Sequence, residues 1–310
     1  MKLCYVIILN YKRWDETVES VRSVFASSYP AVKVVVVDNA SGNASLEQIR
    51  QALASADDKD LRQPALMDHT AFSAMRPADL GRLTLVQNHR NAGFAGGNNI
   101  AIRTLCQEDA WLCLLNPDMT LERDALLHLI RCAERKENSI VGTVHRSYQN
   151  PEKLVMYGGA RVNYWSGNSS LILREKDIRR IQFISGGCLL TDAASYRTIG
   201  PLPEDYFLYW EETDWCYKAT ANGYSIIVCR DAISYDKRST AIGNGFIADY
   251  FYVRNGLLFL RKYKTAYLPT AFALIFVRIA KKLLLGQTAR ARGSSRGIID
   301  FLTGRRYENK

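Results

Sequence analysis

The chain has 310 residues, of which 47% are hydrophobic and 23% are charged, so a mainly disordered or fibrous protein is excluded. The formal net charge is +10. Residues 1–260 hold 29 basic and 29 acidic side chains, whereas residues 261–310 hold 12 and 2, so the whole excess lies in the last fifty residues. We therefore expect a neutral body over 1–260 and a basic extension over 261–310.

Short apolar runs alternate with helical patterns along the first half of the chain. Strands are predicted over 3–9, 32–37, 83–86 and 111–115, and helices from about Asp15 and over 98–106 and 122–135. Runs that are apolar on both faces are typical of a parallel sheet covered by helices on both sides. The alternation predicts a doubly wound α/β domain, with the weakly periodic residues 54–82 as an inserted surface loop.

The second half is less regular. A hairpin is predicted over 157–173, a strand interrupted by Gly186 and Gly187 over 183–190, a helix over 212–221 and a strand over 225–228. Seven scattered cysteines form no CxxC pair, so neither a disulfide framework nor a structural zinc site is expected, and a reducing cytosol is favoured. No apolar run reaches the roughly 20 residues of a membrane-spanning helix, and the first run, without a small-residue cleavage site, is interpreted as a buried strand.

Polar residues follow three of the predicted strands. Asn10 follows the first, Asp38 and Asn39 the second, and the segment Asn116-Pro-Asp118 the strand over 111–115. Because ligands bind at the carboxyl ends of strands in open α/β sheets, these residues together predict a polar crevice. The carboxylate of Asp118 suits Mg²⁺ or Mn²⁺ bridging a diphosphate. A turn or a helix cap is the alternative for each segment taken alone.

Residues 91–99 form a Gly-rich turn that opens a helix, where free N–H groups favour an anion. A plain strand-to-helix turn is the alternative. The spacing of Gly93, Gly96 and Gly97 does not fit G-x-G-x-x-G, and the chain has no G-x-x-x-x-G-K-[ST], so a Rossmann dehydrogenase or a P-loop enzyme is disfavoured.

Residues 206–215 combine five aromatic side chains with the acids Glu211, Glu212 and Asp214. Carboxylates beside aromatic walls can have raised pKa values and serve as general bases. Acids at a helix start also favour the helix dipole, so capping is the alternative, and both roles are compatible.

From Leu268 to Leu283 apolar residues recur at helical spacing, with Arg278, Lys281 and Lys282 on another face. This pattern predicts a basic amphipathic helix suited to an anionic membrane surface. A helix docked on the body, or a homodimer contact, is the alternative, and the Arg-, Gly- and Ser-rich residues that follow are compatible with disorder. The net charge alone also fits a nucleic-acid-binding protein, but the basic residues avoid the Gly-rich and aromatic motifs, so no nucleic-acid partner is expected.

Seven short motifs, in this order, resemble glycosyltransferase family 2, the inverting enzymes of GT-A fold, and within it the rhamnosyltransferase-like branch. They are VIILNY (6–11), VVDNAS (36–41), NxxNxGFAGGNN (88–99), LLNPD (114–118), ISGG (184–187), FLYWEETD (207–214) and YxRN (252–255). The resemblance covers about residues 3–260. It implies an α/β GT-A domain with a mainly parallel, doubly wound sheet, followed by the C-terminal amphipathic helical extension.

The resemblance also implies roles for individual residues. Asp38 would hold the base of the sugar nucleotide, with Asn10 and Asn39 nearby, and Asp118 would bind the metal, with Asn116 in the other position of a DXD-like motif. Glu212 stands where the family has its general base, usually Asp, with Glu211 and Asp214 as alternatives, and Trp210 resembles the platform under the acceptor sugar. The diphosphate and sugar would be lined by Asn91, Gly93, Phe94, Gly96 and Asn98.

One departure concerns the metal. A His that often follows the last strand of the family is missing from residues 232–239. Asp236 is a candidate substitute ligand, and Lys237 and Arg238 are candidates to neutralise phosphate directly. The expected cofactor is a divalent cation, Mg²⁺ or Mn²⁺.

The implied reaction is the inverting transfer of a sugar from a nucleotide-diphosphate sugar to a hydroxyl of a glycan or lipid-linked acceptor in cell-surface polysaccharide synthesis. The branch favours dTDP-rhamnose, with UDP-hexoses as rivals. We expect a cytoplasmic enzyme, peripheral at the inner face of the cell membrane. A catalytically inactive relative that binds carbohydrate or nucleotide sugar is the alternative.

Overall fold

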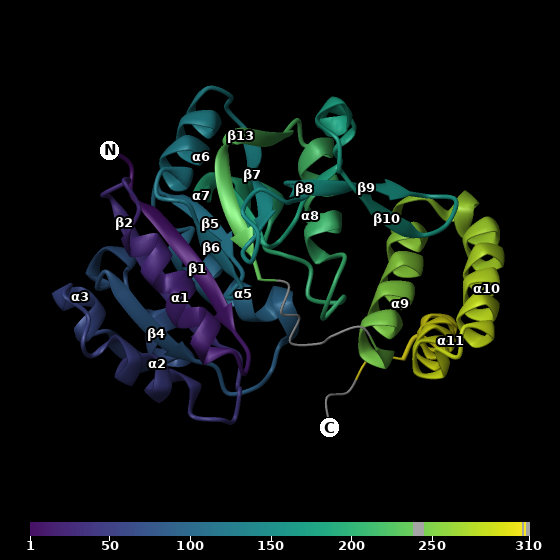
Figure 1. Cartoon of the computed structure of the whole chain (residues 1–310), viewed down its shortest axis with the longest axis horizontal. Helices are drawn as coiled ribbons and strands as arrows, with labels where there is room; N and C mark the ends of the chain where they lie inside the picture. Colours follow the sequence, from purple (N-terminus) through teal and green to yellow (C-terminus); the bar gives the residue numbers. More distant parts are fainter. Residues whose placement is uncertain (238–244, 306, 308–310) are drawn as a thin grey trace.

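A ten-stranded sheet organises the computed structural model, which describes residues 1–237, 245–305 and 307 (Figure 1). The strand order is β3-β4-β2-β1-β5-β12-β7-β13-β6, and β8 pairs with β7. The five strands from β3 to β5 run parallel, whereas β12 is antiparallel to both of its neighbours. The strands are β1 (Cys4–Asn10), β2 (Val32–Asp38), β3 (Ala65–Asp68), β4 (Leu83–Gln87), β5 (Trp111–Leu115), β6 (Met119–Leu121), β7 (Ser139–Ser147), β8 (Leu154–Tyr157), β12 (Cys188–Asp192) and β13 (Ser225–Asp236).

Helices cover both faces of this sheet because its central strands are apolar on both sides. In β1, Val6 and Ile8 belong to one core cluster, while Ile7 and Leu9 belong to the other. The first cluster includes side chains of α1 (Trp14–Phe25), α2 (Ser45–Leu53) and α6 (Ala125–Glu134), and the second includes those of α5 (Gly93–Leu105), α7 (Ala193–Ile199) and α8 (Glu211–Ala221). The predicted doubly wound α/β arrangement is confirmed.

A three-stranded antiparallel sheet lies between the large sheet and a group of three C-terminal helices (Figure 1). Its strands are β9 (Gly159–Asn163), β10 (Asn168–Leu171) and β11 (Phe183–Ile184), and β9 with β10 forms the predicted hairpin. Because Gly186 and Gly187 interrupt the predicted strand over 183–190, its two halves, β11 and β12, belong to different sheets. The three helices are α9 (Phe246–Tyr263), α10 (Leu268–Leu284) and α11 (Thr288–Thr303).

Two segments contain more regular structure than the sequence predicted. Residues 54–82 are no simple loop, because β3 pairs with β4 and extends the sheet, with α3 (Lys59–Arg62) before it and α4 (His69–Ala74) after it. The segment after 287 is the helix α11, which packs closely on α9. A Cβ on Gly293 would lie 2.2 Å from the main-chain oxygen of Phe246, so glycine lets the two backbones approach.

The cysteine prediction needs one correction. Cys132 of α6 and Cys229 of β13 form a disulfide with a Cα–Cα distance of 6.1 Å, although they are 97 residues apart in the sequence. Their spacing carries no signal because the tertiary fold alone brings the helix onto the strand. Among the described residues, no helix combines the length and the apolar character needed to cross a bilayer.

Candidate active site

Polar side chains meet at the carboxyl ends of the neighbouring strands β2 and β1. Asn10 and Asp38 are register partners, and the Asn10 amide donates to Asp38 Oδ1 over 2.6 Å. The other Asp38 oxygen accepts from Ser41 N at 3.0 Å and Gln87 Nε2 at 2.9 Å, and Thr17 Oγ1 donates to Asn10 Oδ1 at 2.9 Å. Both Asn10 and Asp38 are buried. Neither side chain lines the crevice described below, and contact of Asp38 with a nucleotide base stays a prediction.

Asn39 connects the end of β2 to the Gly-rich segment. Its amide nitrogen donates to Asn91 Oδ1 at 2.9 Å and to the Gly93 oxygen at 3.0 Å. Its amide oxygen accepts from Asn88 Nδ2 at 3.1 Å and from Ala92 N at 3.0 Å. Because both ends of the Asn39 amide are used, the Gly-rich segment is held against the strand end. Asn39 and Asn91 both line the crevice described below.

The Gly-rich segment is already helical at Gly93, five residues earlier than predicted. Gly93 has φ +73°, and a Cβ there would lie 2.2 Å from the Phe207 oxygen, which also accepts from Phe94 N at 2.8 Å. The main-chain N–H of Phe94, at the start of the helix, is therefore already bonded to the loop that contains Phe207 and is not available to an anion. Gly96 and Asn98 do not line the crevice, and the Asn98 amide donates to the Phe94 oxygen within α5.

Asp118 occupies the turn between β5 and β6, which Met119 N closes by donating to the Asn116 oxygen at 3.0 Å. Burial, together with the negative charges of Asp236 and Glu16, raises the pKa of Asp118 to about 7. Carboxylates that repel one another in this way favour a bound cation, which would offset their charge.

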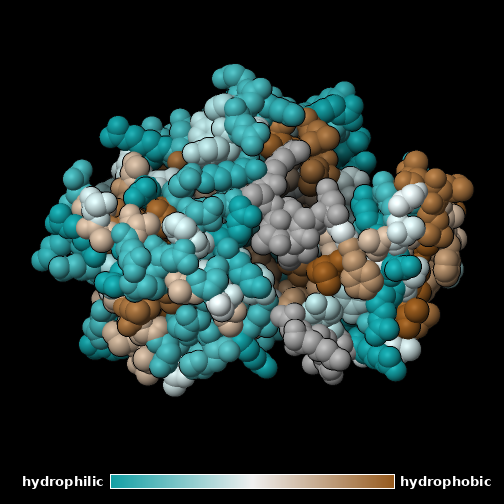
Figure 2. All heavy atoms as spheres, turned by 60° about the horizontal axis from the view of Figure 1, so that its bottom comes forward, coloured by the Kyte–Doolittle hydropathy of each residue, from teal (hydrophilic) through white to brown (hydrophobic). Residues whose placement is uncertain are grey.

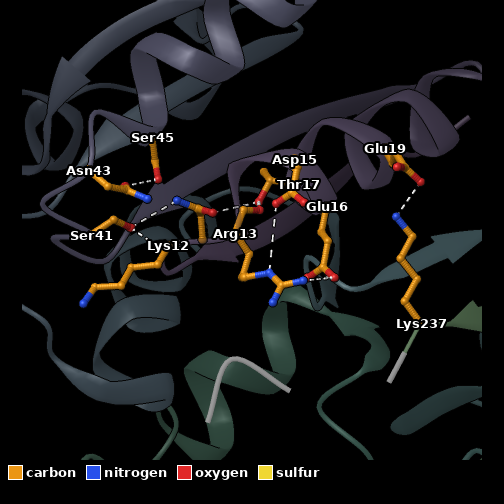
Figure 3. Close-up of polar contacts among 11 residues, drawn as sticks. Lys12, Arg13, Asp15, Glu16, Thr17, Glu19, Ser41, Asn43, Ser45 and Lys237 are labelled. Carbon is orange, nitrogen blue, oxygen red and sulfur yellow. Dashed lines mark hydrogen bonds and ion pairs between the residues drawn. The ribbon is translucent and has the colours of Figure 1, made fainter. Parts of the chain in front are cut away.

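Arg13 and Lys237 bring positive charge to the first turns of α1. Arg13 Nη2 lies 2.5 Å from Glu16 Oε1, and Lys237 pairs with Glu19 one turn further along the helix (Figure 3). Arg238, the second candidate to neutralise phosphate, lies outside the described residues.

A crevice of about 440 Å³ opens in front of these strand ends. Six of the residues predicted to bind the sugar nucleotide or the metal line it: Asn39, Asn91, Gly93, Phe94, Asn116 and Asp118. Sequence reasoning missed other lining residues, among them Arg13, Glu16, Phe251 and Tyr307. Arg13 and Glu16 could have been predicted from the sequence, because they follow the strand end at Asn10. Phe251 and Tyr307 could not, because they belong to α9 and to the segment after α11, far away in the sequence.

The loop that leads into α8 has an unusual backbone. Phe207, Tyr209 and Trp210 have φ angles of +67°, +63° and +78°, which non-glycine residues rarely adopt. The amide nitrogen of Asn255 on α9 lies 2.7 Å from the Leu208 oxygen and 3.1 Å from the Tyr209 oxygen. Strained backbone of this kind persists only where surrounding contacts hold it, and it is common at functional sites.

The first two residues of α8 are neighbouring acids in different surroundings. Glu212 lines a cavity of about 220 Å³ together with Ser169, Trp210 and Tyr252. Burial raises the pKa of Glu212, although the main-chain N–H groups of Glu212 and Gly186 oppose this shift. Glu211 is only 1% exposed and does not line the cavity, and burial followed by repulsion from Glu212 raises its pKa well above its usual range. Of the two, Glu212 is the carboxylate that a substrate in the cavity can reach.

Asp214, the other candidate base, is fully buried in a network of partners. Tyr206 OH donates to it at 2.7 Å and Tyr263 OH at 2.8 Å, and Lys218 and Lys262 lie at 3.1 and 3.0 Å. Burial raises the pKa of Asp214, but the Tyr206 hydrogen bond and the lysine charges outweigh it and lower the pKa overall. An acid that is committed in this way stabilises the fold and is a poor proton acceptor, which corrects the suggestion that it is an alternative base.

Trp210 is less open than the predicted acceptor platform. It is 3% exposed, its Nε1 donates to the Tyr252 oxygen at 3.2 Å, and its ring packs against Phe259. It contributes one wall to the Glu212 cavity. Tyr209 is a more central aromatic residue, because it lines both this cavity and the larger crevice that holds Asp118.

The residues around Asp118 fit a divalent cation only in combination with a substrate. Within residues 1–237, 245–305 and 307, no three His, Cys, Asp or Glu side chains are arranged to hold a metal ion. Carboxylate oxygens suit Mg²⁺ or Mn²⁺, and Mg²⁺ commonly binds through one or two protein carboxylates together with substrate phosphates. The oxygen atoms of Asp118 and Asn116 are therefore compatible with a divalent cation that binds together with a diphosphate.

The mixed, mainly parallel sheet with helices on both faces matches the GT-A fold of solved glycosyltransferases. Residues 5–64 match the family model for glycosyl transferase family 2. A low-salt glycan biosynthesis hexosyltransferase of Haloferax volcanii is 23% identical over 243 residues, which cover 74% of this chain and 66% of that protein. The chain therefore aligns with only part of the length of this relative.

Solved structures agree on the fold. A mannosyltransferase from Pyrobaculum calidifontis, in complex with GDP-Man and Mn²⁺, has a TM-score of 0.58 at 15% identity, with 98% of this chain and 88% of that chain covered. TarS 1–349 of S. aureus, in complex with UDP-GlcNAc, has a TM-score of 0.57 at 14% identity, covering 97% and 81%. Together these findings show the GT-A fold and a similarity to glycosyl transferase family 2 over residues 5–64.

Proposed function

We propose that this protein transfers a hexose from a nucleoside-diphosphate sugar to a hydroxyl group of an acceptor, with inversion at the anomeric carbon. The observation that carries the proposal is the contact between two cavities at Tyr209. The donor crevice, with Asn39, Asn91 and Asp118, lies on one side, and the cavity with Glu212 lies on the other. A donor and an acceptor can thus occupy neighbouring sites with a carboxylate beside the acceptor.

The chemistry is a single displacement. Ionised Glu212 accepts the proton of the acceptor hydroxyl, whose oxygen attacks the anomeric carbon opposite the nucleoside diphosphate. A bond forms between that oxygen and the anomeric carbon while the bond to the diphosphate breaks. Asp118 and Asn116 would hold a divalent cation with the diphosphate, and this cation supplies charge stabilisation for the leaving group. Arg13 lies in the same crevice and adds positive charge.

For the substrates, we propose dTDP-rhamnose as the donor, with UDP-hexoses as the first alternatives, and a glycan or lipid-linked acceptor for cell-surface polysaccharide. The motif resemblance to the rhamnosyltransferase-like branch supports this choice. The relative from Haloferax volcanii, which bears the name of a glycan-biosynthesis hexosyltransferase, supports a glycan acceptor.

We further propose that the enzyme works in the cytoplasm, at the inner face of the cell membrane, through α10. This helix buries Ala271 and Ile275 against the body, which accounts for its docking. Other apolar side chains of α10 and the turn after it remain exposed, and brown atoms gather over this edge of the molecule in Figure 2. They are Leu274, Phe276, Val277, Leu283, Leu284 and Leu285. Exposed apolar groups beside cations suit an anionic bilayer surface.

The experiment that tests the activity is release of nucleoside diphosphate from a panel of sugar nucleotides, with and without Mn²⁺ and with and without acceptor extract. We expect release with one donor, strong dependence on Glu212, and loss in excess EDTA. Donor binding without release in any combination would instead support an inactive sugar-nucleotide-binding protein.

A further inference from the structure

A third cavity, of about 410 Å³, lies among α9, α10, α11 and the start of β10. Three cationic side chains line it, Arg278, Lys282 and Arg290, and Asp249 is the one carboxylate among the described lining residues. We name it the cationic cavity. Its excess of positive charge distinguishes it from the cavity with Glu212 and from the donor crevice.

The carboxylate neutralises only part of this charge. Asp249 pairs with Lys282 and with Arg290, whose Nε lies 2.6 Å from Asp249 Oδ2. Arg278 Nη2 donates to the main-chain oxygen of Ser166 at 2.9 Å, and no ion pair joins Arg278 to a carboxylate of the described residues. Burial lowers the pKa of Arg278, and the negative charges of Tyr252 and Asp249 only partly oppose this shift. The cavity thus holds three cations around a single anion and has room for a second anion.

The cationic cavity adjoins the cavity with Glu212. Tyr209 and Tyr252 line both, so the two are separated only by aromatic side chains. Tyr252 OH is held in place by Ser169, whose main-chain N lies 2.8 Å away. Asn168 also lines the cationic cavity, and its Oδ1 is buried with no hydrogen-bond partner among the described residues. An unused acceptor of this kind suits a ligand that carries hydroxyl groups.

We propose that the cationic cavity binds the phosphate or diphosphate group of the acceptor and thereby presents an acceptor hydroxyl to Glu212. This inference rests on the proposed function and adds the chemical class of its second substrate, a phosphate-linked alcohol or saccharide. Under the proposed function the donor's diphosphate lies at Asp118, on the other side of Tyr209, so a second anion site serves the acceptor. Arginine and lysine side chains in a partly buried site are typical ligands of phosphate oxygens.

Such a phosphate group can belong to a lipid-linked acceptor or to a water-soluble one. Phe276 and Val277, exposed on α10 beside Arg278, favour the lipid-linked source. Two probes separate these sources, farnesyl diphosphate and inorganic diphosphate, with binding to the full chain measured by isothermal titration calorimetry. At least tenfold tighter binding of farnesyl diphosphate supports a lipid-linked acceptor, whereas equal binding supports a soluble one.

A charge-matched pair of variants tests the site itself. We expect Arg278→Gln with Lys282→Gln to weaken binding of both probes at least tenfold, because two of the three cations are removed. The control is Lys281→Gln with Arg292→Gln, which removes the same charge from exposed positions of α10 and α11 and should change binding less than twofold. Equal losses in the two double variants would mean that only net charge matters and would overturn the proposal.

A third variant predicts a change of opposite sign. Asp249→Asn removes the competing carboxylate, so diphosphate binding should become several-fold tighter. Unchanged or weaker binding by a variant with a native circular dichroism spectrum contradicts the proposal even if the double variant fails to fold.

Asp118→Ala separates the inference from the proposed function. We expect this variant to lose release of nucleoside diphosphate and to keep its affinity for farnesyl diphosphate. If the wild-type protein releases no nucleoside diphosphate but shows the variant-dependent binding above, only the proposed activity fails. If it is active and the double variant binds normally, only the cationic cavity is excluded.

Discussion

The side-chain amide of Asn255 lies 3.1 Å from the main-chain oxygen of Tyr209, so a buried residue of α9 holds the loop that separates the donor crevice from the cavity with Glu212. The same amide reaches the oxygens of Tyr206 and Leu208. Three residues of this loop have positive φ angles, and a single side chain binds main-chain oxygens before and among them. Asn255 therefore fixes the backbone that positions Tyr209 and the start of α8.

We predict that Asn255→Ala lowers kcat by about 10–100-fold. Without the amide the loop relaxes, and a shift of Glu212 by about 1 Å from its position beside the acceptor is enough for such a loss. The free energy of unfolding should fall by about 1–3 kcal/mol, since buried oxygens lose their donor. Steady-state kinetics and thermal unfolding measure the two effects. The control, Asn222→Ala at an exposed helix end, should affect neither, and full activity of Asn255→Ala would exclude the positioning role.

The acids of α8 should separate catalysis from stability. We predict that Glu212→Gln lowers turnover by about 10²–10⁴-fold with a nearly unchanged Tm, because it removes a proton acceptor that faces a cavity. Asp214→Asn should instead destabilise the protein by about 3 kcal/mol, because Lys218 and Lys262 lose their buried partner. Kinetics and unfolding of both variants test this split. Near-normal turnover by Glu212→Gln would exclude it as the base.

The pH profile should report the buried pair of acids. Because burial raises the pKa of Glu212, its ionised form is lost at a higher pH than for an ordinary glutamate. Turnover that requires this form should decrease as the pH falls, with an acid limb above pH 4.5, the ordinary value for Glu. Initial rates between pH 4.5 and 8.5 measure it. A flat profile across this range would argue against a carboxylate base in this cavity.

Asp118 should show a trade-off between stability and function. Its folded-state pKa of about 7 lies above the ordinary value of 3.8, so ionisation destabilises the fold. This cost is absent below pH 3.8, grows as the pH rises, and is complete above pH 7. Asp118→Asn should therefore be more stable than the wild-type protein at pH 8, by up to about 4 kcal/mol, with a smaller difference at pH 5.

The same ionisation bears on the metal. A cation binds the ionised carboxylate, so the Mn²⁺ concentration needed for half-maximal activity should decrease as the pH rises from 6 to 8. Activity titrations at fixed donor concentration measure this dependence. Full activity in excess EDTA would show that no cation is needed.

The exposed apolar residues of α10 can be tested without truncation. Cutting the chain after residue 260 would interrupt α9 and remove α11, which packs on it, so loss of binding by that fragment would be ambiguous. Leu284, which is 89% exposed, is a better site. Leu284→Glu should reduce flotation with phosphatidylglycerol liposomes at least threefold, whereas Leu66→Glu, at an exposed position of β3, should not. Equal flotation of both variants would contradict the membrane proposal.

The alternation of apolar runs with helical patterns was sufficient to predict the doubly wound sheet, because each run is buried on both faces. Val6 and Ile7 face opposite core clusters, and only a covered sheet accepts apolar residues at successive positions. The polar residues after those runs could be placed at one edge of the sheet for the same reason, since parallel strands end together. Asn39, Asn116 and Asp118 indeed line one crevice.

Tertiary packing decided what local pattern could not. Residue type alone does not separate Glu211, Glu212 and Asp214, and only the family resemblance placed Glu212 first. In the structure, Lys262 and Tyr263 of α9 bind Asp214, and Glu211 is buried away from the cavity. Glu212 is the acid that lines the cavity. The disulfide and the cationic cavity likewise join residues from distant segments. The spacing of apolar residues in the sequence indicates which face of a single helix or strand is buried. The burial of a polar side chain and the charges around it depend on neighbours from elsewhere in the chain.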